Sequence, residues 1–174
     1  MPQVFTPDRD PPLPQGLNAG RSGGRHPRLE ALFAEYAEAH RNPANRLCHE
    51  AAIPFIALTT IAMLDWIPLG ELGGHRVTAA VAAWAALAAW YIWMDAGLGT
   101  GIAALLVACV PIGRGLHPTA VVAIAAAAWT LQLVGDHAFE RKPQSLPAAL
   151  RHVLVGPAFF LAVMADIGRG RPAP

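Results

Sequence analysis

Charged residues are scarce in this chain. Only 14% of its 174 residues are Asp, Glu, Lys or Arg, while 54% are hydrophobic; soluble domains carry roughly 25% charged residues. The net charge of +1 argues against a nucleic-acid-binding domain, which needs a concentrated basic face. The length suits a single domain. The shortage of charge therefore favours a membrane protein, with a soluble all-α bundle as the alternative.

Cysteine and familiar catalytic motifs are also lacking. Cys48 and Cys109 are the only two cysteines, too few for the disulfide framework of small secreted domains. The N-terminal region has no apolar stretch of the kind found in signal peptides. A P-loop, a Gly-x-Ser-x-Gly elbow, a His-Glu-x-x-His zinc motif and a dinucleotide fingerprint are all absent. These absences exclude the commonest sequence signatures of nucleotide-binding and hydrolytic sites.

The chain divides into three parts by composition. Residues 1–27 are rich in Pro, Gly and Arg, which predicts a disordered tail. Residues 28–168 form the predicted membrane helical domain, and 169–174 a short C-terminal tail. An amphipathic helix is expected from Pro27 or Arg28 to about His40, because apolar residues recur there at helical spacing. Asn42-Pro43 should end it and start a second helix.

Five apolar segments follow, at 51–69, 77–94, 101–112, 119–135 and 148–165. Each is slightly shorter than the ~20 residues of a full crossing, and their many alanines permit close helix packing. Strand signals are weak. The predicted fold is therefore all-α, a membrane helical bundle of four to five spans preceded by an amphipathic interfacial helix. Whether it forms a homo-oligomer stays open.

Basic residues predict the orientation. Arg21, Arg25, Arg28, Arg41 and Arg46 precede the first span, which places the N-terminus inside. Twelve arginines against one lysine, with abundant Ala, Gly and Pro, suggest a high-GC bacterial source and hence a plasma membrane. In this topology the polar groups that fall together on the cytoplasmic side are His40, His49, Asp95, His137, Glu140 and His152.

Two groups of residues in this set have the composition of a metal site. His40 and His49 flank the Asn-Pro break, which allows the two helices to fold together so that both rings reach one ion. His137 and Glu140 are three residues apart, hence adjacent on a helix. Imidazole ligands combined with a carboxylate, in a site that leaves some coordination positions open, are typical of non-haem Fe(II). Asp136 is an alternative ligand or a supporting partner, and histidines that act only as structural anchors remain the other interpretation.

These motifs resemble the 2-hydroxy fatty acid dioxygenase family of fatty-acid α-oxidation. The first match is Tyr36-x3-His40-x-Asn42-Pro43-x-Asn45-x3-His49-x4-Pro54. The second comprises Gln132, Gly135, His137, Phe139-Glu140 and Pro143, with Asp136 inserted where the family usually has Gly directly before His. The similarity covers about residues 29–166.

The resemblance implies a multi-span membrane protein that uses Fe(II) and O2 to shorten a 2-hydroxy fatty acid by one carbon. It implies His40, His49 and His137 as metal ligands, and Asn45 and Glu140 as additional or supporting ligands. Tyr36 would orient His40 or contact the substrate. Apart from the resemblance, the predicted topology places Asp95, Asp136 and His152 near the site, where they are expected to support it. The alternatives are a membrane protein whose polar cluster is structural or lipid-binding, and a metal-dependent membrane hydrolase.

Overall fold

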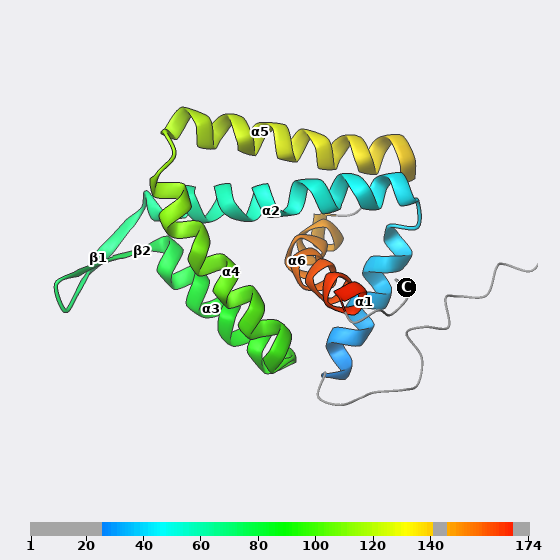
Figure 1. Cartoon of the computed structure of the whole chain (residues 1–174), viewed down its shortest axis with the longest axis horizontal. Helices are drawn as coiled ribbons and strands as arrows, with labels where there is room; N and C mark the ends of the chain where they lie inside the picture. Colours follow the sequence, from blue (N-terminus) through cyan, green and yellow to red (C-terminus); the bar gives the residue numbers. More distant parts are fainter. Residues whose placement is uncertain (1–25, 141–145, 169–174) are drawn as a thin grey trace, which may run out of the picture.

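The computed structural model describes residues 26–140 and 146–168, and it confirms the predicted all-helical bundle. Figure 1 shows α2 and α5 side by side, α3 and α4 as a second pair that meets them at one end, and α1 and α6 near the other end. The helices are α1 (Pro27–Ala39), α2 (Pro43–Asp65), α3 (Ala79–Met94), α4 (Ala96–Arg114), α5 (Pro118–Gly135) and α6 (Leu146–Gly168). A π-helical turn, η2 (Asp136–Glu140), continues α5.

The break at Asn42-Pro43 lies where the sequence predicts it. The Asn42 side chain accepts a hydrogen bond from the backbone N–H of Ala44 at 2.9 Å, and Pro43 occupies the first helical position of α2. The cap satisfies a backbone donor that has no partner inside the helix, and proline lacks the donor that would otherwise need one. The turn thus directs α2 away from α1 and keeps His40 and His49 at a corner between them. Of the predicted tails, 1–27 and 169–174, residues 1–25 and 169–174 lie outside the described residues, whereas His26 caps α1 and Pro27 is its first residue.

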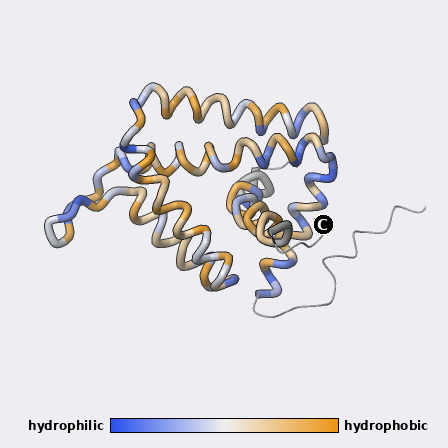
Figure 2. The backbone as a smooth tube through the Cα atoms, in the orientation of Figure 1, coloured by the Kyte–Doolittle hydropathy of each residue, from blue (hydrophilic) through white to orange (hydrophobic). Residues whose placement is uncertain are grey.

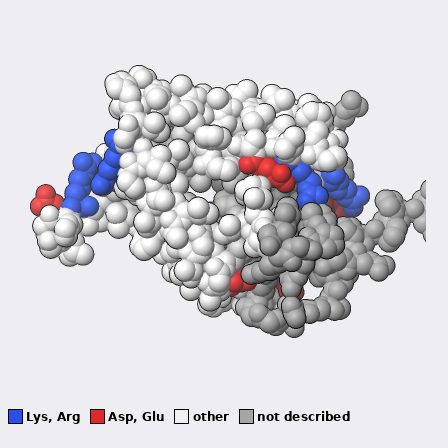
Figure 3. Space-filling view, viewed as in Figure 1, with Lys and Arg blue, Asp and Glu red and all other residues white. Residues whose placement is uncertain are grey.

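Three helices are long and apolar enough to cross a membrane, namely α2, α4 and α5, the last extended to Phe139. The shorter apolar helices, α3 and residues 151–165 of α6, complete the expected set of five. Figure 2 shows hydrophobic residues along all of these helices, and the visible flank of α5 in Figure 3 carries no charge. On that face the charged groups lie mainly at the hairpin end and where α1 meets α2. The chain is therefore a helical membrane protein.

A β-hairpin between α2 and α3 was not expected from the sequence. Strands β1 (Pro68–Leu72) and β2 (His75–Thr78) pair antiparallel. Their connection is Gly73-Gly74, with φ of 59° and 77°, and a two-residue hairpin turn of this kind needs positive φ at both positions. The Gly-Gly pair was the available signal, but the flanking strands are too short and too exposed to show a clear alternation.

Asp65 joins three elements at the hairpin end of the bundle. Its carboxylate is 8% exposed and accepts hydrogen bonds from Arg114 Nε at 2.7 Å and Nη2 at 3.0 Å, and from Thr78 Oγ1 at 2.9 Å. We expect Asp65→Ala to lower the free energy of unfolding by about 2 kcal/mol, because it leaves the buried Thr78 hydroxyl and the Arg114 guanidinium without this acceptor. Thermal unfolding in detergent micelles measures the change.

The matched control for this prediction is Glu38→Ala. Glu38 pairs with Arg41 within one exposed stretch, where both side chains are more than half exposed, so its loss should cost less than about 0.5 kcal/mol. Equal effects of the two substitutions would contradict the stabilising role assigned to Asp65.

Candidate metal centre

The Asn-Pro turn brings His40 and His49 into contact, with ring centroids 4.4 Å apart. Each ring bonds through Nδ1 to a backbone carbonyl four residues earlier: His40 to Tyr36 O at 2.8 Å, and His49 to Asn45 O at 3.0 Å. A carbonyl can only accept, so Nδ1 carries the proton, and in the neutral form of each ring Nε2 holds the lone pair. Both rings therefore present a metal-binding nitrogen, in the tautomer that the backbone selects.

Asp136 offers a third atom that could bind a metal ion. Its Oδ1 lies 3.4 Å from His49 Nε2 and 3.8 Å from His40 Nε2, and the three atoms lie within 4.8 Å of one another. Ligands ~2.1 Å from a shared ion are separated by roughly 3.0–3.4 Å, so a small inward movement of His40 would complete the set. Two imidazoles and one carboxylate form the donor set of non-haem iron oxygenases.

His40 provides the test of whether these residues fit a metal. Its Nε2 is buried and has no hydrogen-bond partner among the described residues, which is costly unless another group satisfies it. Burial lowers the pKa of His40 to about 4, so the ring is neutral at pH 7 and offers a lone pair to an electrophile. A cation between His40, His49 and Asp136 would satisfy this atom, and the residues present fit it.

Other side chains hold this group in place. Tyr36 stacks on His40 with ring centroids 4.2 Å apart, and burial raises the pKa of the Tyr36 hydroxyl. Asn45 is fully buried, and its Nδ2 donates to Asp136 Oδ1 at 3.3 Å. The His152 ring lies 5.2 Å from that of His40, although α6 is far along the chain. Tyr36 and Asn45 thus restrict the orientation of two ligand groups.

Gly135 allows α5 to approach α2 closely enough to place Asp136. A Cβ at this position would lie 2.5 Å from Asn45 Oδ1 and 2.9 Å from Cys48 Cβ. Both distances are shorter than real side chains tolerate. The π-helical turn starts directly afterwards, and single π turns are frequent at functional sites.

The structure does not bring all of the predicted residues together. His137 is exposed and bonds through Nδ1 to Leu133 O at 2.9 Å, so Asp136, not His137, joins His40 and His49. Consecutive helical residues point about 100° apart, and the Asp inserted after Gly135 therefore takes the inward position. Asp95 caps α4 through Leu98 N, outside the group. The side chain of Glu140 lies outside the described residues, and the ligand set itself stays a prediction.

Gln132 belongs to the second sequence motif, but no role could be assigned to it from the sequence. It lies four residues before Asp136, hence on the same side of the helix, and lines a cavity together with Tyr36, His49 and His152. Its Oε1 is buried and lacks a hydrogen-bond partner among the described residues. The i, i+4 spacing from Asp136 is the signal that identifies it, once Asp136 is known to point inward.

No curated protein and no solved structure matches the chain. Residues 27–167, from the first residue of α1 almost to the end of α6, match one family. Its description, 2-hydroxy-palmitic acid dioxygenase Mpo1-like, agrees with the resemblance carried by the sequence motifs. The chain therefore belongs to the 2-hydroxy-palmitic acid dioxygenase Mpo1-like family.

Proposed function

We propose that this protein is an Fe(II)-dependent dioxygenase that shortens 2-hydroxy fatty acids by one carbon at a membrane boundary. The observation that carries the proposal is the convergence of His40 Nε2, His49 Nε2 and a carboxylate oxygen of Asp136. Three protein ligands on one side of an ion leave positions open for substrate and O2. The family description names the same substrate class.

The overall reaction balances without a further reductant. A 2-hydroxy acid and O2 give an acid one carbon shorter, CO2 and water, as the C1–C2 bond breaks and four electrons pass to O2. Bound Fe(II) would supply the activation of O2 that this chemistry needs. The protein would orient the imidazoles through Tyr36 and Asn45 backbone carbonyls. The Gln132 side chain would form a hydrogen bond with the 2-hydroxyl or the carboxylate of the substrate.

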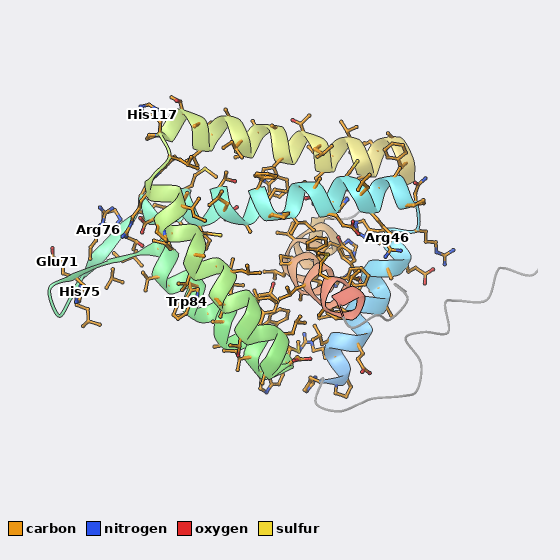
Figure 4. The ribbon with its side chains drawn as sticks, viewed as in Figure 1. Arg46, Glu71, His75, Arg76, Trp84 and His117 are labelled. Carbon is orange, nitrogen blue, oxygen red and sulfur yellow. The ribbon has the colours of Figure 1, made fainter. Side chains whose placement is uncertain are left out.

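Arg46 is the basic residue best placed for the substrate carboxylate. It lines a small recess together with Tyr36, His49 and Glu50, and Figure 4 shows it on α2 close to the end of α1. Arg41 and Arg151 do not line this recess. A fatty acid lying in the bilayer has its carboxylate at the headgroup level, where Arg46 would neutralise it.

Arg46→Gln should raise KM for a 2-hydroxy acid by at least roughly tenfold, because a charge-assisted hydrogen bond contributes about 1.5–3 kcal/mol. The value of kcat should change less, since Arg46 is not expected to touch the reacting bond. Steady-state kinetics with 2-hydroxypalmitic acid in nanodiscs measures both constants. Arg41→Gln removes the same charge five residues away and should leave KM unchanged; an equal effect would show that only surface charge matters.

The decisive experiment measures oxygen consumption and product together. Protein purified without metal is loaded anaerobically with Fe(II), mixed with 2-hydroxypalmitic acid and exposed to O2. We expect one O2 consumed for each acid shortened by one carbon, as detected by mass spectrometry. Absence of stoichiometric iron would favour a structural or lipid-binding cluster. Substrate cleavage without O2 uptake would favour a metal-dependent hydrolase.

The proposed location is a bacterial plasma membrane with the metal centre on the cytoplasmic side. The arginines near the start of α2 support this orientation through the positive-inside rule. Cysteines introduced at exposed sites beside the centre, such as Arg41→Cys, should be protected from a membrane-impermeant thiol reagent in intact cells. Labelling of that position from outside would reverse the orientation.

A further inference from the structure

An apolar cavity of about 170 Å³ adjoins the metal centre inside the bundle. It is partly open and lined mainly by α2, α3, α4 and α6, with Tyr36 of α1 and Gln132 of α5 also contributing; Figures 1 and 4 show how these helices are arranged around the middle of the molecule. Its aliphatic walls include Ile53, Ala57, Ile61, Leu87, Leu106 and Leu154. The lining is almost entirely apolar, so a water molecule would find few hydrogen-bond partners in this space.

The cavity runs along one side of α2. His49, Ile53, Ala57 and Ile61 all line it, and their spacing of four residues keeps them on one side of the helix. From His49 to Ile61 the helix rises about 18 Å at ~1.5 Å per residue. A chain-like molecule could therefore extend from the metal centre along three turns of α2.

The two ends of the cavity differ in chemistry. Tyr36, His49, Gln132 and His152 lie at the end shared with the metal centre. At the other end Ile61 precedes Ala62, whose Cβ would lie 2.6 Å from a Cβ on Gly113 of α4. This close helix contact leaves little room between α2 and α4 beyond Ile61. A molecule with one polar end and an alkyl tail would enter with its polar end at the histidines.

We propose that this cavity holds the alkyl chain of the substrate and that the close contact between α2 and α4 at its far end limits chain length. The inference rests on the proposed function, because it takes the polar head to be a 2-hydroxy acid at the metal centre. An alkyl chain that leaves lipid for a protein gains little from the hydrophobic effect, since both surroundings are apolar. Selection among chain lengths then depends on steric fit, with Ala57 at mid-channel and Leu106 on the α4 wall as the determining positions.

Substitutions at these two positions test the channel. In Ala57→Leu the added side chain occupies mid-channel, so kcat/KM for 2-hydroxypalmitic acid should fall at least roughly tenfold relative to that for 2-hydroxyoctanoic acid. Leu106→Ala should shift the preference toward longer acids. Ala104→Leu makes the same change on α4 at an exposed residue outside the cavity, and it should leave the ratio unchanged. A uniform loss for all chain lengths in Ala57→Leu and Leu106→Ala would overturn the proposal.

Photolabelling tests the channel without turnover, in the unmodified protein. A palmitic acid analogue with a diazirine near its methyl end should label residues near Ile61 or Leu106, while a diazirine near the carboxylate should label near His152. Labels confined to exposed residues such as Leu105 and Val107 would contradict the proposed alkyl-chain site even if the enzyme is active. Labelling inside the cavity without oxygen-dependent turnover would support the alkyl-chain site and contradict the proposed dioxygenase activity.

Discussion

Replacing His49 with alanine is expected to abolish stoichiometric iron binding and to lower turnover of 2-hydroxypalmitic acid by more than about a hundredfold. Groups that only support metal ligands already change affinity by ~10–100-fold when removed, and His49 Nε2 is one of three converging ligand atoms. Metal analysis after anaerobic loading measures the first effect, and coupled oxygen uptake the second. Circular dichroism verifies that the helices remain intact.

His137→Ala is the matched comparison, because it removes the same side chain one residue from Asp136. His137 is exposed and bonds to its own helix, so its loss should leave iron stoichiometry unchanged, whereas Asp136→Ala should abolish it. Loss of iron in His137→Ala but not in Asp136→Ala would support His137 as the third ligand, as expected from the sequence, and would contradict Asp136, which the geometry favours. The two variants thus separate a local sequence motif from the three-dimensional site.

Gly99→Ala is expected to destabilise the protein by about 3 kcal/mol, the upper range for overpacking. A Cβ on Gly99 would lie 2.3 Å from Ile92 N and 2.4 Å from Tyr91 C. Backbone atoms of α3 cannot move aside as the end of a flexible side chain can, so α3 and α4 must separate. Their separation would displace Tyr91, whose hydroxyl donates to Leu154 O of α6. The unfolding temperature in detergent should fall by about 10 °C.

Gly97→Ala is its control on the same helix. Among the described residues a Cβ there meets only Asp95 Oδ1, at 3.5 Å, which is ordinary van der Waals contact. Alanine is a better helix former than glycine by up to ~1 kcal/mol, so this variant should be as stable as the parent or slightly more stable. A comparable loss at both positions would show that α4 resists any added side chain and that the contact with α3 is not the cause.

The helices themselves could be predicted because their signals are local. Runs of apolar residues, the Asn42-Pro43 boundary and the recurrence of Leu29, Phe33 and Tyr36 on one face of α1 depend only on nearby residues. The hairpin was missed for the same reason: its strands are short and exposed, so they show no periodic burial. Gly73-Gly74 was a turn signal without strong strands on either side.

The sequence by itself determined the helical membrane fold, the family and the meeting of His40 with His49, because a single short turn separates the two rings. Only the tertiary structure placed Asp136 inward and His137 outward. That choice depends on how α5 is rotated against α2, which the close approach at Gly135 and the start of the π turn set together. The cavity beyond the histidines likewise depends on how several helices pack together. Its walls come from residues far apart in the chain, so no local sequence pattern predicts it.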